Sequence, residues 1–338
     1  MTGVQTCALP ILEAFAVPAY SRLMFEQARS GDLKGAQLTF HRIRPDQADT
    51  VVEVVATELN RQKVFDAAEA VAGWHTDASY LNKSRSDRAV VQLRNGDADA
   101  ALKTMEGVDI DFLKAAFLIE LAQVEISHHD LPSALATLEK CLRITQSIDA
   151  GIRPWYLLEV AAQQFAAHDV AGARATLQES LKVTDSLESV QQQKWRYQTA
   201  IYLSVIGDID EAKAILVEFQ PYANIAAHGL TEIARQQAVH GDRDGAEKSF
   251  RDALVLAKNV KNMGPLDSGS SRPNTLRDIG SAMITVRMSD TLRSMIDAES
   301  DRNVVAYLSL GAAEGFELRT SDGSGDRKVF AKKPVIDK

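Results

Sequence analysis

The sequence predicts an all-α protein made of repeated pairs of helices, because two small-residue patterns recur along the chain. The first is a turn motif, Gly-Asp or His-Asp, with alanine four residues after the aspartate. The second is a column of mostly alanine residues twelve positions before each of those alanines. The patterns return every 32 to 39 residues, and such a period is typical of repeat architectures, in which each repeat is one supersecondary unit. The motif occurs at Gly31-Asp32, Gly96-Asp97, His129-Asp130, His168-Asp169, Gly207-Asp208 and Gly241-Asp242.

Each repeat is expected to contain a first helix, a tight turn and a second helix. Apolar residues precede the turn motif at helical spacing, as in Leu157, Val160 and Ala161. Glycine ends the first helix because it adopts the left-handed conformation easily, and histidine is among the residues enriched at positive φ. The aspartate can cap the N-terminus of the second helix. The alanines after the turn follow one another at spacings of 32 to 39 residues: Ala36, Ala68, Ala101, Ala134, Ala173, Ala212 and Ala246.

This register divides the chain into about eight repeats within residues 12–316. Ala68 belongs to a repeat that lacks the turn motif, and Leu276, Ile279, Gly280 and Met283 begin an eighth. A closing helix and a polar, flexible tail are expected at 302–316 and 317–338, since a solenoid needs its exposed end capped. The repeats are expected near 13–44, 46–75, 84–108, 112–146, 154–188, 192–220, 223–261 and 273–300.

The first eleven residues do not fit this register. Residues 1–11 resemble the translation of a sequencing-adapter oligonucleotide, and such segments are set aside in an analysis of the fold. The alternative, a degenerate signal peptide, lacks a basic start and a long enough apolar core. The native N-terminus is therefore expected to be missing. The compartment stays open, with the cytoplasm favoured and an exported form still allowed.

The repeat resembles the tetratricopeptide repeat, whose period is 34 residues and whose second helix contains alanine followed four residues later by phenylalanine. Ala246, Phe250, Ala253 and Leu254 give the best match. The tryptophan and the terminal proline of the family are absent, and two repeats are five residues longer. The resemblance implies a right-handed α-α superhelical solenoid with a C-terminal capping helix. It also implies a protein-binding role on the concave side.

Composition and motifs give no indication of enzymatic chemistry. The net charge of −8 disfavours general binding to nucleic acid, and no apolar run approaches the length of a membrane-spanning helix. The sequence contains no phosphate-binding loop, nucleophile elbow, zinc-protease motif or Cys-x-x-Cys pair. Cys141 is expected to be a buried packing residue, and His128-His129 a helix end. No enzyme activity, cofactor or metal site is predicted.

The resemblance also indicates which first-helix residues would line the concave groove. It implies an apolar, aromatic middle with basic ends, which suits a peptide or protein segment with hydrophobic anchors and acidic flanks. Trp155, Phe165 and Tyr197 have a second interpretation, as core residues that fill space between the longer repeats. The expected groove residues are Arg29, Arg61, Arg94, Ile119, Gln123, Ile126, Trp155, Leu158, Phe165, Tyr197, Ile201, Arg235 and Arg277. The same register adds Glu53, Asn60, Lys83, His228 and Asn274.

Two classes of function follow from these observations. The first is a non-enzymatic scaffold that holds a protein or peptide partner in its groove. The second is the sensory or regulatory part of a larger regulator or enzyme whose N-terminal portion is missing.

Overall fold

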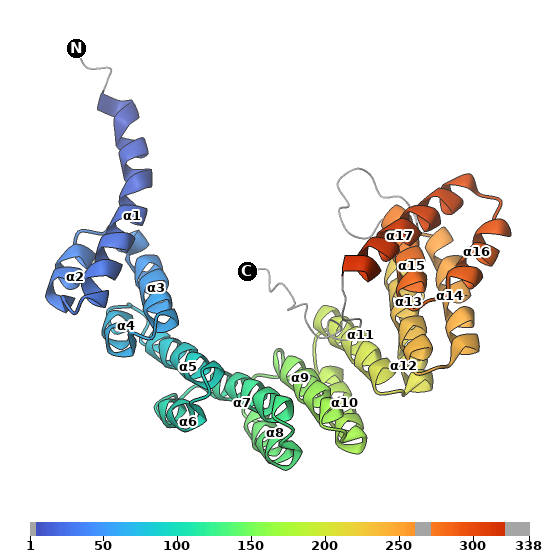
Figure 1. Cartoon of the computed structure of the whole chain (residues 1–338), viewed down its shortest axis with the longest axis horizontal. Coiled ribbons are helices and arrows are strands. Elements are labelled where there is room, and N and C mark those ends of the chain that lie inside the picture. The colour runs from blue at the N-terminus through green and yellow to red at the C-terminus, as the bar shows by residue number, and fades with distance from the viewer. Residues whose placement is uncertain (1–4, 261–271, 322–338) are drawn as a thin grey trace. The chain divides into compact units, whose positions relative to one another are not determined.

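The protein is all-α throughout the residues that the structure describes, as predicted. The computed structural model describes residues 5–260 and 272–321, and the side chains of residues 17–260 and 272–318. These residues form the helices α1 to α17 and contain no β-strand (Figure 1). The expected tail is helical up to Ser321 as part of α17, and its remainder lies outside the described residues, as does the Gly/Ser/Pro-rich segment from residue 263 to 271.

The chain divides into two compact units, Met1–Ile148 and Asp149–Lys338. In each unit, consecutive helices pack as hairpins, and each first helix also packs on the first helix of the next hairpin. The first unit contains α1 (Gln5–Arg29), α2 (Leu33–Phe40), α3 (Pro45–Arg61), α4 (Phe65–Ala72), α5 (Ser79–Arg94), α6 (Ala98–Glu106), α7 (Asp111–Ser127) and α8 (Leu131–Thr145). The second contains α9 (Arg153–Ala166), α10 (Val170–Asp185), α11 (Ser189–Val205), α12 (Ile209–Val217), α13 (Ala223–Val239), α14 (Arg243–Lys258), α15 (Arg272–Thr285), α16 (Ser289–Asp297) and α17 (Arg302–Ser321).

The turn motif has the conformation that the sequence predicts. Its glycines lie at positive φ, between 84° and 93°, and His129 and His168 take the same place at 61° and 65°. Lys63 and Arg287 adopt this conformation in the two hairpins that lack the motif. Most of the aspartates accept a hydrogen bond from the backbone N–H three residues later, which caps the second helix. Asp208 instead pairs with Arg174.

A polar contact, buried or partly buried, joins the two helices of several hairpins. In the hairpin of α9 and α10, Thr176 Oγ1 donates a hydrogen bond of 2.8 Å to Gln164 Oε1. The same contact, between residues twelve apart, joins Thr39 to Gln27, Thr104 to Gln92 and Ser249 to Gln237. Where these two positions are not polar, both are apolar: Leu59 with Val71, Leu203 with Ile215, and Met283 with Met295. In the hairpins named here, the two positions are therefore either both polar and hydrogen-bonded or both apolar.

The last helix, α17, packs unusually closely on α15. A Cβ atom on Gly311 would lie 2.0 Å from the carbonyl oxygen of Arg277, and one on Gly280 would lie 2.3 Å from that of Leu308. The helices run parallel, since Gly311 lies against Arg277 and Gly315 lies against Ser281. Val304 and Leu308 of α17 are fully buried in the hydrophobic core that α17 shares with α13 to α16. The glycines thus allow the backbones to touch.

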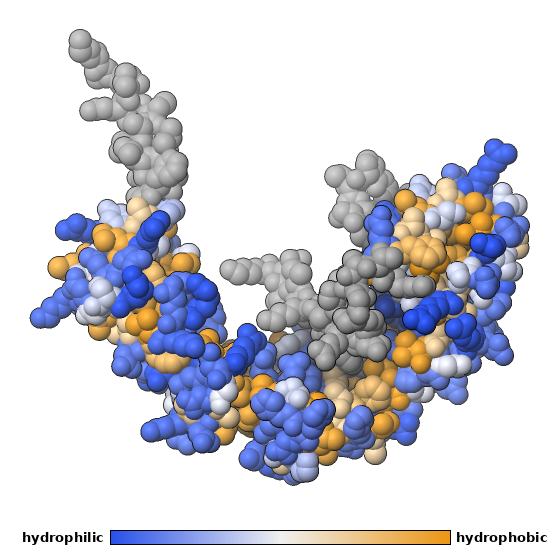
Figure 2. Space-filling view, in the orientation of Figure 1, coloured by the Kyte–Doolittle hydropathy of each residue, from blue (hydrophilic) through white to orange (hydrophobic). Residues whose placement is uncertain are grey.

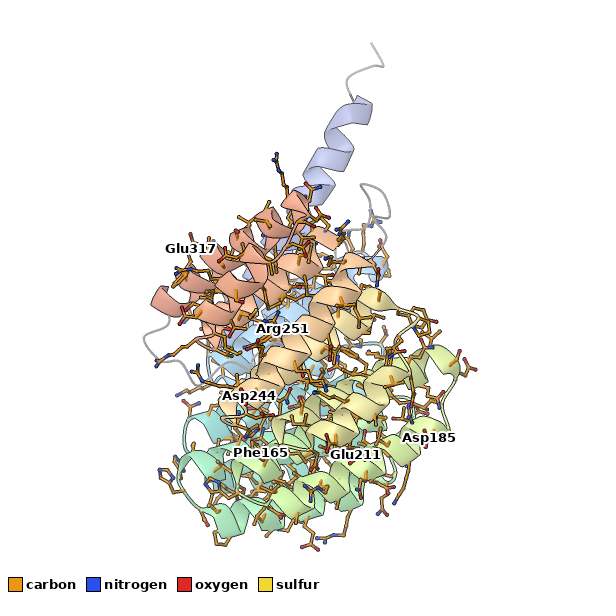
Figure 3. The ribbon with its side chains drawn as sticks, turned by 90° about the vertical axis from the view of Figure 1, so that its right-hand side faces the viewer. Phe165, Asp185, Glu211, Asp244, Arg251 and Glu317 are labelled. Atoms are coloured by element: carbon orange, nitrogen blue, oxygen red, sulfur yellow. The ribbon has the colours of Figure 1, made fainter. Side chains whose placement is uncertain are left out.

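Hydrophilic side chains cover most of the visible outside of each unit, with smaller apolar areas between them (Figure 2). On α14, for example, Asp244 and Arg251 lie two turns apart on the exposed face (Figure 3). None of the described helices is both long and apolar enough to cross a bilayer. Cys141 is buried, and its burial raises the pKa of the thiol to about 12, so the thiol stays protonated.

Candidate functional site

A pocket of about 440 Å³ opens on the first helices of the second unit. Its size lies within the range of roughly 300–1,000 Å³ that is typical of ligand pockets. Apolar side chains and hydrogen-bonding side chains both contribute to its walls. It is lined by Val190, Gln193, Lys194, Tyr197 and Gln198 of α11, Phe219 after α12, Asn224, Ile225 and His228 of α13, and Thr275 and Asp278 of α15.

Tyr197 joins two walls of this pocket. Its hydroxyl shares a hydrogen bond with Nδ1 of His228, and its ring meets Phe219 edge-on, with centroids 5.8 Å apart. Gly229 permits this arrangement, because a Cβ there would lie 2.7 Å from Leu216 and 3.2 Å from the ring of Tyr197. Burial raises the pKa of Tyr197, so the phenol keeps its proton at neutral pH.

The pocket also contains charged groups of both signs. Burial raises the pKa of Asp278, and the neighbouring Glu232 acts in the same direction. His228 and Arg277 act in the opposite direction. Lys194 lies over the ring of Trp195, at 4.7 Å from its centroid. With the carboxamides of Gln193, Gln198 and Asn224, the walls can donate and accept hydrogen bonds in several directions. This mixture suits binding of a polar chain that carries an apolar side chain.

The structure brings Tyr197 and His228 together in the pocket, as the groove register implies. The other apolar groove candidates of this unit have different environments. Leu158 is only 3% exposed and belongs to the core of α9 to α13, so its assignment to an open groove is wrong. Trp155 and Phe165 are half-buried and pack against that core; Phe165 is labelled in Figure 3. Ile201 and Asn274 are also half-buried.

Trp155 does not line the pocket and packs on the core instead. Its ring meets Tyr156 edge-on, with centroids 4.6 Å apart. Its indole Nε1 is buried and has no hydrogen-bond partner among the described residues.

In the first unit, the predicted groove residues do not converge on one site. Ile119 is 7% exposed and therefore belongs to the interior. Asn60 is also buried, where its Nδ2 donates hydrogen bonds of 2.9 and 3.1 Å to the carbonyl and hydroxyl oxygens of Ser84. Gln123 is exposed and Ile126 half-buried, as is Glu53. Lys83 lies over the ring of Tyr80. Ile119 and Asn60 are thus structural residues rather than groove residues.

The arginines expected to give the groove basic ends are all ion-paired. Arg61 Nη2 lies 2.5 Å from Glu58 Oε1, and hydrogen bonds from Arg61 and Gln62 lower the pKa of Glu58 to about 2. The pairing partners lie on the same helix or on a neighbouring one. The other pairs are Arg29 with Glu26, Arg94 with Glu120, Arg235 with Glu232, and Arg277 with Glu314. Arg61 and Arg94 remain 70% and 63% exposed in their pairs, and exposed ion pairs are weak, so the basic ends of the groove stay a prediction.

Most residues of the pocket wall are not among the groove residues predicted from the sequence. Gln193, Lys194 and Gln198 lie within one turn of Tyr197 on α11, so helical spacing from Tyr197 could have found them. Asp278 lies on α15 and has no such signal, because its place depends on how α15 packs against α13. The described residues contain no group of three or more side chains that could hold a metal ion.

No protein-family model matches the chain, and no curated protein matches it significantly.

Proposed function

We propose that the chain is a divergent tetratricopeptide-like α-solenoid that acts as a non-enzymatic protein-interaction scaffold. The repeated hairpins, with their left-handed turn residue, aspartate cap and alanine columns, support the right-handed solenoid. The parallel packing of α15 and α17 supports the assignment of α17 as the helix that closes the C-terminal end.

One observation carries the binding function: the pocket of the second unit is built from successive first helices. Lys194 of α11 and His228 of α13 occupy equivalent positions, eighteen residues before Ala212 and Ala246. A peptide along these helices would place an apolar side chain against Phe219 and Ile225. The carboxamides of the wall would bond its backbone. Hydrophobic anchors therefore remain part of the proposal, and acidic flanks stay a prediction together with the basic ends of the groove.

The test starts from a peptide selected from a random twelve-residue display library with the full chain as bait. Its affinity is then measured by isothermal titration calorimetry for the wild type and for Gln193→Ala/Gln198→Ala. The double variant removes polar wall atoms without touching the core, and we expect at least a tenfold loss of affinity, which is about 1.4 kcal/mol.

Asp244→Ala/Arg251→Ala provides the matched control, because these exposed residues of α14 lie outside the pocket. Unchanged affinity of the pocket variant, with an unchanged far-ultraviolet circular dichroism spectrum, would contradict the proposal. Failure to select any peptide would contradict it as well.

A further inference from the structure

In each unit, a notch lies between the second helices of two consecutive hairpins. The first of these two helices is short and the second is long. In the first unit, the notch lies between α6, of nine residues, and α8, of fifteen, with α7 as its floor. In the second, it lies between α12, of nine residues, and α14, of sixteen, over α13. The α6–α8 notch has a volume of about 420 Å³ and the α12–α14 notch about 360 Å³.

The two notches are equivalent in position but differ in charge. Counted from the alanine of each second helix, Lys140 corresponds to Asp252 and Arg143 to Val255. On the floor, Lys114 corresponds in the same way to Ala226. The α6–α8 notch is lined by Leu102, Met105, Glu106, Lys114, Phe117, Leu118, Lys140, Arg143 and Ile144. The α12–α14 notch is lined by Lys213, Leu216, Val217, Gln220, Ala226, Leu230, Asp252, Val255 and Leu256.

The α6–α8 notch therefore has an apolar floor and a basic rim. Phe117 forms the buried part of the floor, while Leu102 is 43% exposed at the edge. Of the basic rim residues, Lys114 pairs with Asp111 at 3.9 Å, whereas Lys140 forms no ion pair within the described part of the chain. Arg143 pairs with Glu139, but both side chains are mostly exposed, at 60% and 72%, so the pair is weak and easily exchanged. Among the residues that line the notch, three are cationic and one, Glu106, is anionic.

We propose that the α6–α8 notch binds the apolar face of an acidic amphipathic helix from a partner protein. A helix fits between two helices that flank a third, because its apolar ridge fills the groove between them. Carboxylates beside that ridge would meet Lys114, Lys140 and Arg143, which selects acidic over basic partners. The α12–α14 notch, with one cation and one anion in its lining, lacks this selectivity.

The probe for the test is a synthetic, fluorescein-labelled helical peptide of sixteen residues with leucines on one face and glutamates beside them. A second peptide replaces the glutamates with lysines. Fluorescence polarisation with the full chain gives both affinities at low salt and at high salt. We expect the acidic peptide to bind at least tenfold more tightly, and its affinity to fall several-fold at high salt, because exposed charges are screened.

Substitutions that exchange the rim residues of the two notches show which notch binds the peptide. Lys140→Asp/Arg143→Val gives the α6–α8 notch the rim of its counterpart and should weaken the acidic peptide at least tenfold. Adding Asp252→Lys/Val255→Arg to that variant should restore part of the affinity at the α12–α14 notch. Leu102→Asp, which alters only the apolar edge, should also weaken binding at least tenfold. Circular dichroism checks that each variant is folded.

Three results would overturn the proposal. The first is an absence of saturable binding of the acidic peptide, and the second is equal affinity for the two peptides. The third is an affinity unchanged by Lys140→Asp/Arg143→Val or by Leu102→Asp in folded protein. Sedimentation velocity tests the other occupant: a wild-type dimer that Leu102→Asp dissociates would assign the notch to a second copy of the chain instead.

Discussion

At the scale of single residues, the most informative contact is the hydrogen bond between residues twelve apart in a hairpin. Gln164 and Thr176 are both buried, and each satisfies the other. In the next hairpin, Leu203 and Ile215 occupy the same two positions. The chain therefore contains two solutions for one site, polar–polar and apolar–apolar, and a mixed pair would leave a buried polar group unsatisfied.

This alternation predicts a strong coupling between the two positions. Gln164→Leu and Thr176→Ile should each lower the free energy of unfolding by about 1–3 kcal/mol. The double variant, which recreates the apolar pair, should cost clearly less than the sum of the two. Urea unfolding of the four proteins measures the coupling. Additive losses would show that the two side chains act independently.

A half-buried glutamate in the second unit should make stability depend on pH. The side chain of Glu299 is 7% exposed and accepts a hydrogen bond of 2.7 Å from Lys258, and this contact lowers the pKa of Glu299. Because the pKa of Glu299 is lowered in the folded state, its ionised form stabilises the fold at pH values above the ordinary carboxyl pKa of about 4.5. This contribution is lost as the pH falls below that value. Glu299→Gln should therefore cost about 1–3 kcal/mol at pH 7 and progressively less as the pH falls below about 4.5.

The matched control for this prediction is Glu139→Gln, which removes the exposed pair with Arg143. It should change the free energy of unfolding by less than about 0.5 kcal/mol. Urea unfolding at pH 7 and at pH 3.5 gives both values. A loss for Glu299→Gln that is equal at the two pH values would contradict the assigned cause.

The ion pairs of the groove arginines show which contacts can be predicted from the sequence and which cannot. Arg29, Arg61 and Arg235 were interpreted as groove cations because of their register. A glutamate precedes each of them by three residues, and that spacing places the two side chains side by side on a helix. The pairing was therefore visible in the sequence for these three. Arg94 and Arg277 pair across helices, with Glu120 and Glu314, which only the packing reveals.

At the scale of helices and turns, the left-handed turn residue is the element that the sequence predicted best. The expected conformation of the glycines, and of His129 and His168, is confirmed. The hairpins without the motif were found from the spacing alone, and their turn residues, Lys63 and Arg287, are ordinary side chains held at positive φ. The geometry is thus imposed by the hairpin and is only made easier by glycine.

Arg287 should therefore be a site where glycine stabilises the protein. Arg287→Gly relieves a left-handed conformation that costs roughly 1–2 kcal/mol, less the entropy that glycine loses on folding, so we expect a gain of about 0.5–1 kcal/mol. Arg293→Gly, in the interior of α16, is the control and should cost about 1 kcal/mol. Thermal unfolding of both variants measures the difference. A loss of stability for Arg287→Gly would contradict the account of the turn.

The contact between α15 and α17 depends on the absence of side chains. Gly311→Ala gains helix propensity but places Cβ against the backbone of Arg277, so we expect a net loss of about 1–3 kcal/mol. Ser309→Ala, on the exposed side of α17, should stay within about 0.5 kcal/mol of the wild type. Amide hydrogen exchange should also show faster exchange in α17 of the glycine variant. An unchanged rate with unchanged stability would mean that the two helices can separate at no cost.

At the scale of the whole molecule, the sequence predicted the helical class and the positions of the turns. Both follow from local signals, namely apolar spacing and turn residues. It did not predict which groove positions would be open, because exposure depends on the sizes of side chains from different helices. Leu158 and Ile119 fill their space, whereas Gly229 lets Tyr197 and Leu216 approach α13 beside the pocket.

The central claim is that the first helices of the second unit bind a peptide. Hydrogen–deuterium exchange of the full chain, with and without the selected peptide at saturating concentration, tests it most directly. The account predicts slower amide exchange in α11, α13 and α15, with α14 unchanged as the internal reference. Slower exchange confined to other helices, or no change at saturation, would contradict the claim.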